Sequence, residues 1–234
     1  MSFALTTLVC GVRASGRDVV GFSLLEMLMV IALIAALCIA YLNGFGGGQA
    51  AALQSAQAIL AELILEARGK ALATGHETRL LLNCGSAGNP TPARFLRCLV
   101  VQEQVDDGSW KSAATVTLPR GTVILPPNGV VSATLLVGKD PWVDTNGQAL
   151  ESTALLPVAG TGLVPAFPDE LWCGLTFDPE GSVVSAGGNI IVASCRPEPG
   201  DSSCPLRCAS ARGVRGVLVS RYGIPVSLNG WGEI

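Results

Sequence analysis

The residues best suited to chemical reaction in this chain of 234 residues are its eight cysteines. Cys10 and Cys38 lie near the N-terminus, and six more lie further along: Cys84, Cys98, Cys173, Cys195, Cys204 and Cys208. An even number suits disulfides in an oxidising compartment, so all six are candidates. The segment Cys195–Cys208 is typical of a stapled loop, and Cys84 with Cys98 would close a turn rich in Gly and Pro. The alternative is that the thiols stay reduced and pack as small apolar side chains.

Metal binding and catalysis are poorly supported by the other residues. Zinc sites use closely spaced Cys or His pairs, but Cys204 and Cys208 are separated by three residues and His76 is the sole histidine. Asp144–Gly147 resembles the start of a calcium loop without the acidic residues that should follow. Neither a nucleophile motif nor a phosphate-binding loop occurs. We therefore expect no enzyme, no cofactor and no resident metal.

The composition is apolar, and the apolar excess is concentrated in one segment. Charged residues make up 14% of the chain, against about 25% in a typical soluble domain. With 15 basic against 18 acidic residues, a basic nucleic-acid binder is excluded. Phe22–Leu42 carries a single charge, on Glu26, and is long enough to cross a bilayer core of about 30 Å. Arg13 and Arg17 precede it, which predicts a cytoplasmic N-terminus and a single membrane pass.

Glu26 is unexpected in this segment, because a carboxylate inside a membrane costs roughly 2.5–3.5 kcal/mol. A cleaved signal peptide would need a site of small residues after the apolar run, where Tyr41 and Leu42 stand. A lipoprotein signal would need a small residue before Cys10 or Cys38, which follow Val and Leu. An uncleaved anchor stays open. None of these three alternatives accounts for Glu26.

The segment Gly21–Glu26 reads Gly-Phe-Ser-Leu-Leu-Glu and resembles the processing motif of type IV prepilins and type II secretion pseudopilins. The resemblance implies cleavage by a prepilin peptidase between Gly21 and Phe22, N-methylation of Phe22, and a role in assembly for Glu26. Residues four apart share a helix face, so Glu26 would pair with the new α-amino group of its own subunit or of a neighbour. The leader, residues 1–21, is longer than is usual in that family. The implied partners are the peptidase, other pilin or pseudopilin subunits, an inner-membrane assembly platform and a cytoplasmic ATPase.

The remaining sequence predicts a second helix and then strands. Residues 43–48, Asn-Gly-Phe-Gly-Gly-Gly, should break the first helix. Gln49–Thr74 has apolar residues at helical spacing, including Leu72, and Gly75 is a suitable C-cap. Short β-type runs with turns such as Asp107-Gly108 follow, and Asp140–Asp169 is typical of a loop.

The predicted fold class is therefore α+β: a long N-terminal membrane-spanning helix followed by an antiparallel β-rich, pilin-like head. The predicted divisions are a leader (1–21), a transmembrane and assembly segment (22–42), a linker with an amphipathic helix (43–75) and the head (76–234).

The resemblance extends weakly to residues 174–226, whose strand and turn pattern is similar to that of minor pseudopilin H and related minor pilins. It implies a minor pilin-like structural subunit of a secretion pseudopilus or a type IV pilus, held in the inner membrane with its head in the periplasm. The alternative function is a single-pass anchored extracytoplasmic binding module.

Overall fold

A computed structural model describes residues 23–44, 47–85, 93–127, 151–160, 162–185, 187–197, 206–208 and 213–230. The chain divides into two compact units, Met1–Phe45 and Gly46–Ile234. Several residues singled out above lie outside the described residues: Gly21, Phe22, Cys10, Cys204 and the Asp144–Gly147 segment. The backbone, but not the side chains, is described for residues 36–44 and 206–208.

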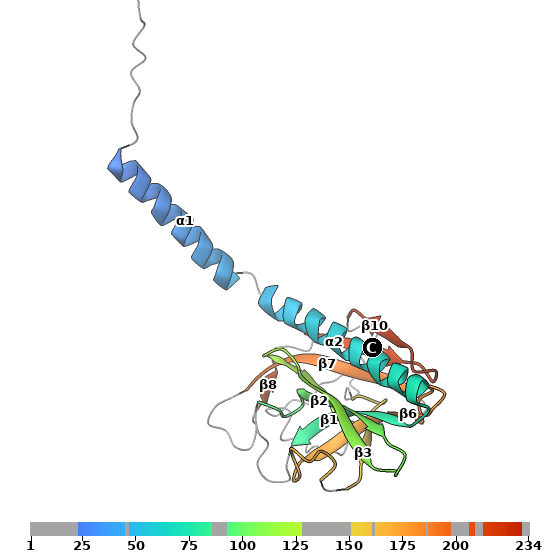
Figure 1. Ribbon diagram of the computed structural model, residues 1–234. Coiled ribbons are helices and arrows are strands. Elements are labelled where there is room, and N and C mark those ends of the chain that lie inside the picture. The colour runs from blue at the N-terminus through green and yellow to red at the C-terminus, as the bar shows by residue number, and fades with distance from the viewer. Residues whose placement is uncertain are drawn as a thin grey trace, which may run out of the picture. The chain divides into compact units, whose positions relative to one another are not determined.

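Two helices come first. Helix α1, Leu24–Gly44, forms the described part of the first unit, and helix α2, Gly47–Thr74, begins the second unit (Figure 1). Helix α2 ends at the predicted C-cap: Gly75 has a φ of 69°, and its N–H donates to the Ala71 carbonyl at 2.9 Å. A left-handed residue closing the last turn in this way is the usual role of glycine after a helix.

The first sheet has five antiparallel strands in the order β3-β2-β1-β6-β5. Their bounds are Thr78–Gly85 (β1), Cys98–Gln104 (β2), Trp110–Thr117 (β3), Leu156–Val158 (β5) and Leu171–Phe177 (β6). The predicted Asp107-Gly108 turn joins β2 to β3, with Gly108 at a φ of 78°. The segment expected to be a loop contains β5, so that expectation was wrong there. Pro157 is tolerated in β5 because β5 is an edge strand.

The second sheet has the order β10-β9-β7-β4, and β8 pairs with the far end of β7. Its bounds are Thr122–Ile124 (β4), Gly188–Pro197 (β7), Leu206–Cys208 (β8), Val214–Val219 (β9) and Pro225–Leu228 (β10). All of its pairings are antiparallel. An apolar helix followed by antiparallel sheets confirms the predicted α+β class.

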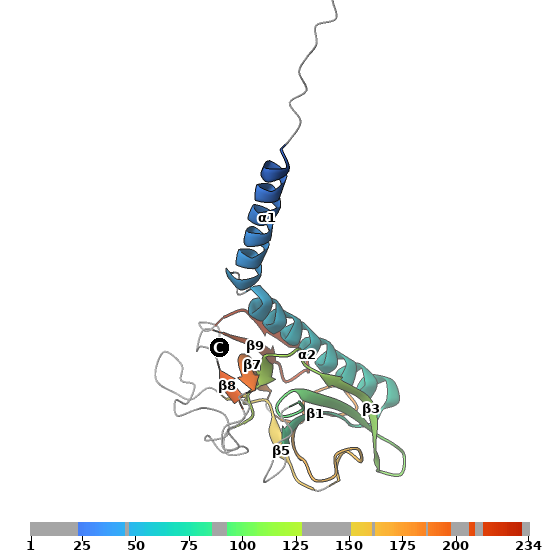
Figure 2. The same ribbon diagram turned by 90° about the vertical axis from the view of Figure 1, so that its left-hand side faces the viewer.

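Helix α2 packs against strands of both sheets, and Figures 1 and 2 show it lying along the head. One side of the helix enters the main core with these residues: Leu53, Ala56, Leu60, Leu63, Ile64, Ala67 and Ala71. Leu72, which the spacing placed on that side, is half exposed instead, and Ala71 is buried in its place.

The first sheet also has a smaller core on the face away from the main core. Leu81, Cys98, Val100, Val164 and Trp172 are buried there. Strand β1 is consequently buried along its whole length, with neighbouring side chains entering different cores. This explains why the middle of β1 has three consecutive leucines, residues 80–82, rather than an alternation of apolar and polar residues.

Candidate functional site

Helix α1 is capped at its N-terminus by Ser23. The backbone N–H of Glu26 donates to Ser23 Oγ at 3.2 Å, and the Glu26 and Met27 amides also donate to the Ser23 carbonyl. Ser followed three residues later by Glu is the pattern of a helix-capping box. The Glu26 carboxylate therefore lies in the first turn, where the helix dipole favours a negative charge. Ser23 was not among the predicted site residues, although the Ser-x-x-Glu spacing is visible in the sequence.

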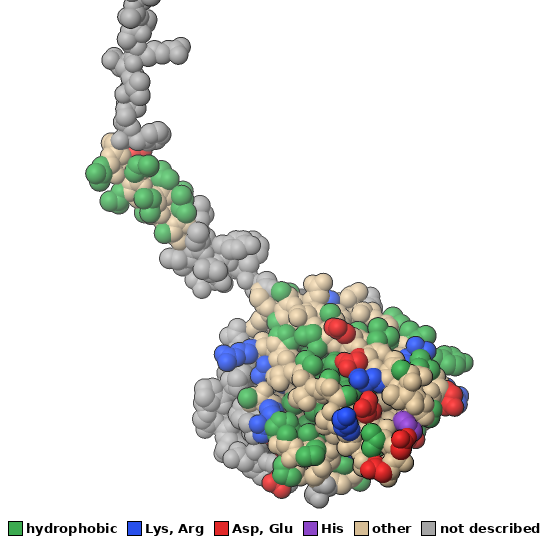
Figure 3. All heavy atoms as spheres, viewed as in Figure 1, with side chains coloured by type: hydrophobic (Ala, Val, Ile, Leu, Met, Phe, Trp, Pro, Cys, Tyr) green, Lys and Arg blue, Asp and Glu red, His purple; other side chains and the backbone are tan. Residues whose placement is uncertain are grey.

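The described side chains of α1 are apolar on every side of the helix. Consecutive residues are exposed, so no face is set aside for a soluble core: Leu24, Leu25, Met27, Leu28, Met29, Val30, Ile31, Leu33 and Ile34. Figure 3 shows hydrophobic side chains along this helix, whereas the visible face of the head mixes basic and acidic groups. Glu26 is the sole charged residue in α1. A helix that is hydrophobic all round needs a membrane or other apolar helices around it.

Length and hydropathy also single out the second helix. Gly48–Thr74 is long and apolar enough to cross a membrane, while the stretch of α1 with described side chains, Leu24–Ala35, is shorter. Helix α2, however, places one side in the core of the head. The buried amide of Gln57 also donates from Nε2 to the Gly216 and Leu228 carbonyls at 2.7 and 2.9 Å. These contacts assign α2 to the core of the head.

The candidate cysteines fall into separate environments. Cys84 and Cys173 have free thiols and lie in the main core, whereas Cys98 has a free thiol in the smaller core. Cys84 and Cys98, suggested above as a pair, enter different cores on opposite faces of the first sheet, since successive side chains along a strand alternate between the two faces. Cys195 is disulfide-bonded. Its register neighbour on β8 is Cys208.

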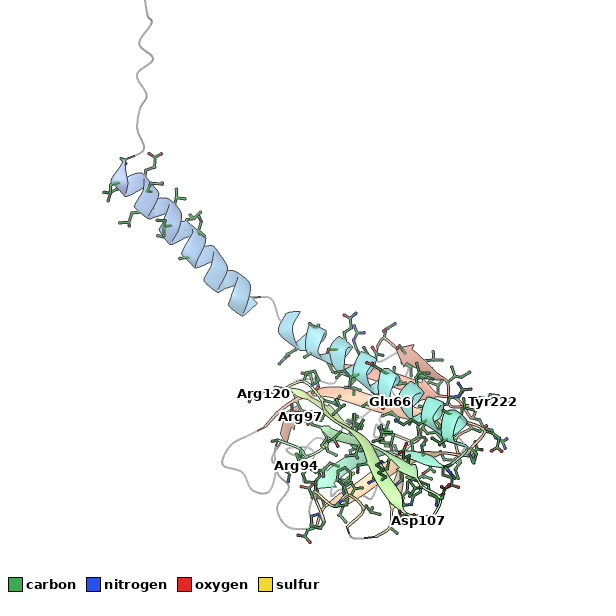
Figure 4. The ribbon with its side chains drawn as sticks, in the orientation of Figure 1. Glu66, Arg94, Arg97, Asp107, Arg120 and Tyr222 are labelled. Atoms are coloured by element: carbon green, nitrogen blue, oxygen red, sulfur yellow. The ribbon has the colours of Figure 1, made fainter. Side chains whose placement is uncertain are left out.

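A partly buried ion pair lies within one polar cluster of the head. Glu170 is 8% exposed, and its Oε1 accepts from Arg94 Nη2 at 2.9 Å and from Arg94 Nε at 3.3 Å. Asn83 donates from Nδ2 to the other carboxylate oxygen, Oε2. Arg94, labelled in Figure 4, also stacks on the Phe167 ring at 4.4 Å. These contacts tie the loop before β6 to β1 and to the residues that precede β2.

The remaining candidates do not assemble a catalytic or metal centre. His76 lies just after α2, and its Nε2 is 3.0 Å from the exposed carboxylate of Asp106. Within the described residues, no three His, Cys, Asp or Glu side chains gather in a way that would hold a metal.

Comparison with known proteins gives neighbours of fold alone. No protein-family profile and no curated protein matches the sequence. Among solved structures, the type IV minor pilin FimU of Pseudomonas aeruginosa is 14% identical, with a TM-score of 0.37, over 75% of this chain and 87% of that one. The minor pseudopilin EpsH of the Vibrio cholerae type II secretion system is 13% identical, with a TM-score of 0.36, over 75% of this chain and 95% of that one. Because these TM-scores lie below 0.5, the function proposed below is derived from the chain's own residues.

Proposed function

We propose that this protein is a pilin-like structural subunit that is anchored and assembled through α1. The carrying observation is a helix of 21 residues, apolar on every described side, with Glu26 as its sole charge and a folded β-rich head after it. The helix satisfies its first turn through Ser23, so capping leaves the Glu26 carboxylate available for a partner. Among the described residues, no ion pair involves that carboxylate.

The partner proposed for Glu26 is an α-amino group created by cleavage between Gly21 and Phe22. Such a group four residues before Glu26 lies on the same helix face, and the equivalent group of a neighbouring subunit is a second possibility. Either pairing offsets the cost of a carboxylate in a membrane, roughly 2.5–3.5 kcal/mol. The intermolecular pairing would also fix the axial register between subunits. A prepilin peptidase, an inner-membrane platform and a periplasmic head belong to the same proposal.

The decisive experiment is mass spectrometry of the mature N-terminus in the native host, with and without its prepilin peptidase. We expect a chain beginning with N-methylated Phe22, and an intact leader when the peptidase is absent or in Gly21→Val. A chain that still begins at Met1, or one cut after residue 42, contradicts the proposal. An intact Met1 would favour the anchored binding module instead.

Assembly is tested separately with Glu26→Leu. This variant should be cleaved normally but lost from sheared filaments or from cross-links to other subunits. Glu62→Leu is the matched control, because Glu62 is an exposed acid on α2 and should leave incorporation unchanged. Normal incorporation of Glu26→Leu would remove the assembly role of this carboxylate.

A further inference from the structure

Two thiols lie on the same face of neighbouring strands in the first sheet. Cys84 lies in β1 and Cys173 in β6, and these strands are antiparallel neighbours. The side chains are 4% and 0% exposed, and both belong to the core covered by α2. Cys173 is the first cause of the raised pKa of the Cys84 thiol, and Cys84 Sγ donates to the Leu82 carbonyl at 3.6 Å. Of the three free cysteines described, these two lie on neighbouring strands and enter the same core.

The strand register brings the two thiols together. Leu82 is the Cα partner of Cys173, and the pairing shifts between Asn83 and Gly85, which leaves Cys84 as the extra residue of a bulge. Cys84 thus stays on the same face as Leu82 and lies diagonally across from Cys173. A disulfide needs Cβ atoms about 3.5–4.5 Å apart and an S–S bond of about 2.05 Å. Cys84, as the bulge residue, and Cys173 share one face of neighbouring strands, so a disulfide between them needs side-chain movement but no change of strand pairing.

We propose that Cys84 and Cys173 form a structural disulfide between β1 and β6 when the head folds in an oxidising compartment. The compartment rests on the proposed function, which puts the head in the periplasm. The pairing itself rests on the strand register and on the core that the two cysteines share, and it is independent of the role of α1.

The chemistry requires an external disulfide as the oxidant, such as that of a thiol–disulfide oxidoreductase or oxidised glutathione. One cysteine thiolate attacks this disulfide and forms a mixed disulfide, and the second thiolate then attacks the protein sulfur. Two protons leave the cysteines, and two electrons reduce the oxidant to its thiols. The interaction with Cys173 and the burial both raise the pKa of Cys84, so the folded, reduced pair reacts slowly. Oxidation therefore accompanies folding.

Cys98 provides a matched control within the same sheet. It is 1% exposed, as buried as the pair, but it faces the smaller core beside Trp172 and Val100. Burial also raises the pKa of its thiol. Cys98 should therefore stay reduced under conditions that oxidise Cys84 and Cys173. Cys195, which is disulfide-bonded, reports independently whether the head met an oxidising environment.

The test maps thiols in the full-length chain. Membranes are denatured in the presence of one alkylating reagent, then reduced, and then treated with an isotopically distinct reagent before peptide mass spectrometry. We expect a linked Cys84–Cys173 peptide before reduction, and Cys98 carrying the first reagent. A protein with Cys195 oxidised but Cys84 and Cys173 both carrying the first reagent overturns the proposal, as does a link from either cysteine to Cys98.

A second arm separates the pairing from the location of the head. The full chain is synthesised without cells into detergent micelles in a glutathione buffer, and the same peptides are mapped. Formation of the Cys84–Cys173 link in this arm supports the pairing even if every cysteine is reduced in cells. Reduction of every cysteine in cells would instead contradict the periplasmic placement of the head. Failure of the link in this arm, with Cys195 oxidised, overturns the pairing alone.

The bond should also have a measurable effect on stability. It would close a loop of about 90 residues, and cross-links of such loops stabilise mainly by restricting the unfolded chain. Replacing both cysteines, Cys84→Ala with Cys173→Ala, should lower the melting temperature of the oxidised protein by about 5–15 °C. Added reductant should abolish most of that difference. Cys98→Ala should show no such dependence on reductant.

Discussion

Replacing Gln57 by leucine should remove the hydrogen bonds that this side chain makes from α2 to the second sheet. The Gln57 side chain is 4% exposed and donates to the carbonyls of Gly216 and Leu228, which are register partners on β9 and β10. Its Oε1 accepts from Arg215 Nη1 at 3.1 Å. Leucine has nearly the same volume and keeps the apolar contacts, but it leaves the two carbonyls without this donor.

The size of the effect follows from the burial of the two acceptors. A buried acceptor left unsatisfied costs about 1–3 kcal/mol, and a partly buried one costs less. The Gly216 contact is buried and the Leu228 contact is partly buried. Allowing for the greater apolar character of leucine, we expect a loss of about 2 kcal/mol, or about 4–8 °C in melting temperature for a domain of this size.

The assay is a urea titration of the full chain in detergent micelles, followed by tryptophan fluorescence, to which the buried Trp172 contributes. Gln54→Leu is the matched control, because Gln54 is exposed on the same helix and has no such contacts. If the free energies of unfolding of the two variants agree within about 0.5 kcal/mol, the reasoning about unsatisfied acceptors is refuted.

Three further variants test other features in the same titration. Gly69→Ala should stabilise the head by about 0.5–1 kcal/mol, because nothing lies within 4 Å of a Cβ there and alanine favours the helix. Gly223→Ala should destabilise it by about 1–3 kcal/mol, because φ is 71° and the new Cβ would lie 2.6 Å from the Gly181 carbonyl oxygen; equal midpoints for the two variants would contradict both statements. Glu170→Gln should lose about 1–2 kcal/mol through its weakened contact with Arg94, and the loss should shrink in an Arg94→Met background. An unchanged loss in that background would show that the pair is not its cause.

Local signals predicted the elements well. The run of apolar residues gave the position of α1, the Gly-rich residues 43–48 contain its end, and Gly75 marks the end of α2. These features depend on neighbouring residues, so the sequence contains them directly. The Asp107-Gly108 turn is of the same kind.

Contacts between distant residues were not predictable in the same way. The pairing of β1 with β6 joins residues about 90 positions apart, and no local pattern specifies that partner. The possible pairing of Cys84 with Cys98 was suggested by their short separation in sequence, which does not reveal that the two residues enter different cores. Gln57 was missed because a polar residue on a helix is usually exposed, and its burial becomes evident only once β9 and β10 are placed. Glu170 was missed because its partners, Asn83 and Arg94, are distant in sequence.

The position of β1 has a mechanical consequence for a subunit held by its N-terminal helix. Strand β1 follows α2 directly and is hydrogen-bonded on one side to β2 and on the other to β6. A load transmitted through α2 therefore reaches the middle of the sheet and acts along the axis of β1. Such a load strains both ladders of hydrogen bonds together, in shear, whereas an edge strand can be peeled away one bond at a time. The edge strands β3 and β5 lie outside this path, so the strand at which the chain enters the first sheet is also one that is bonded on both sides.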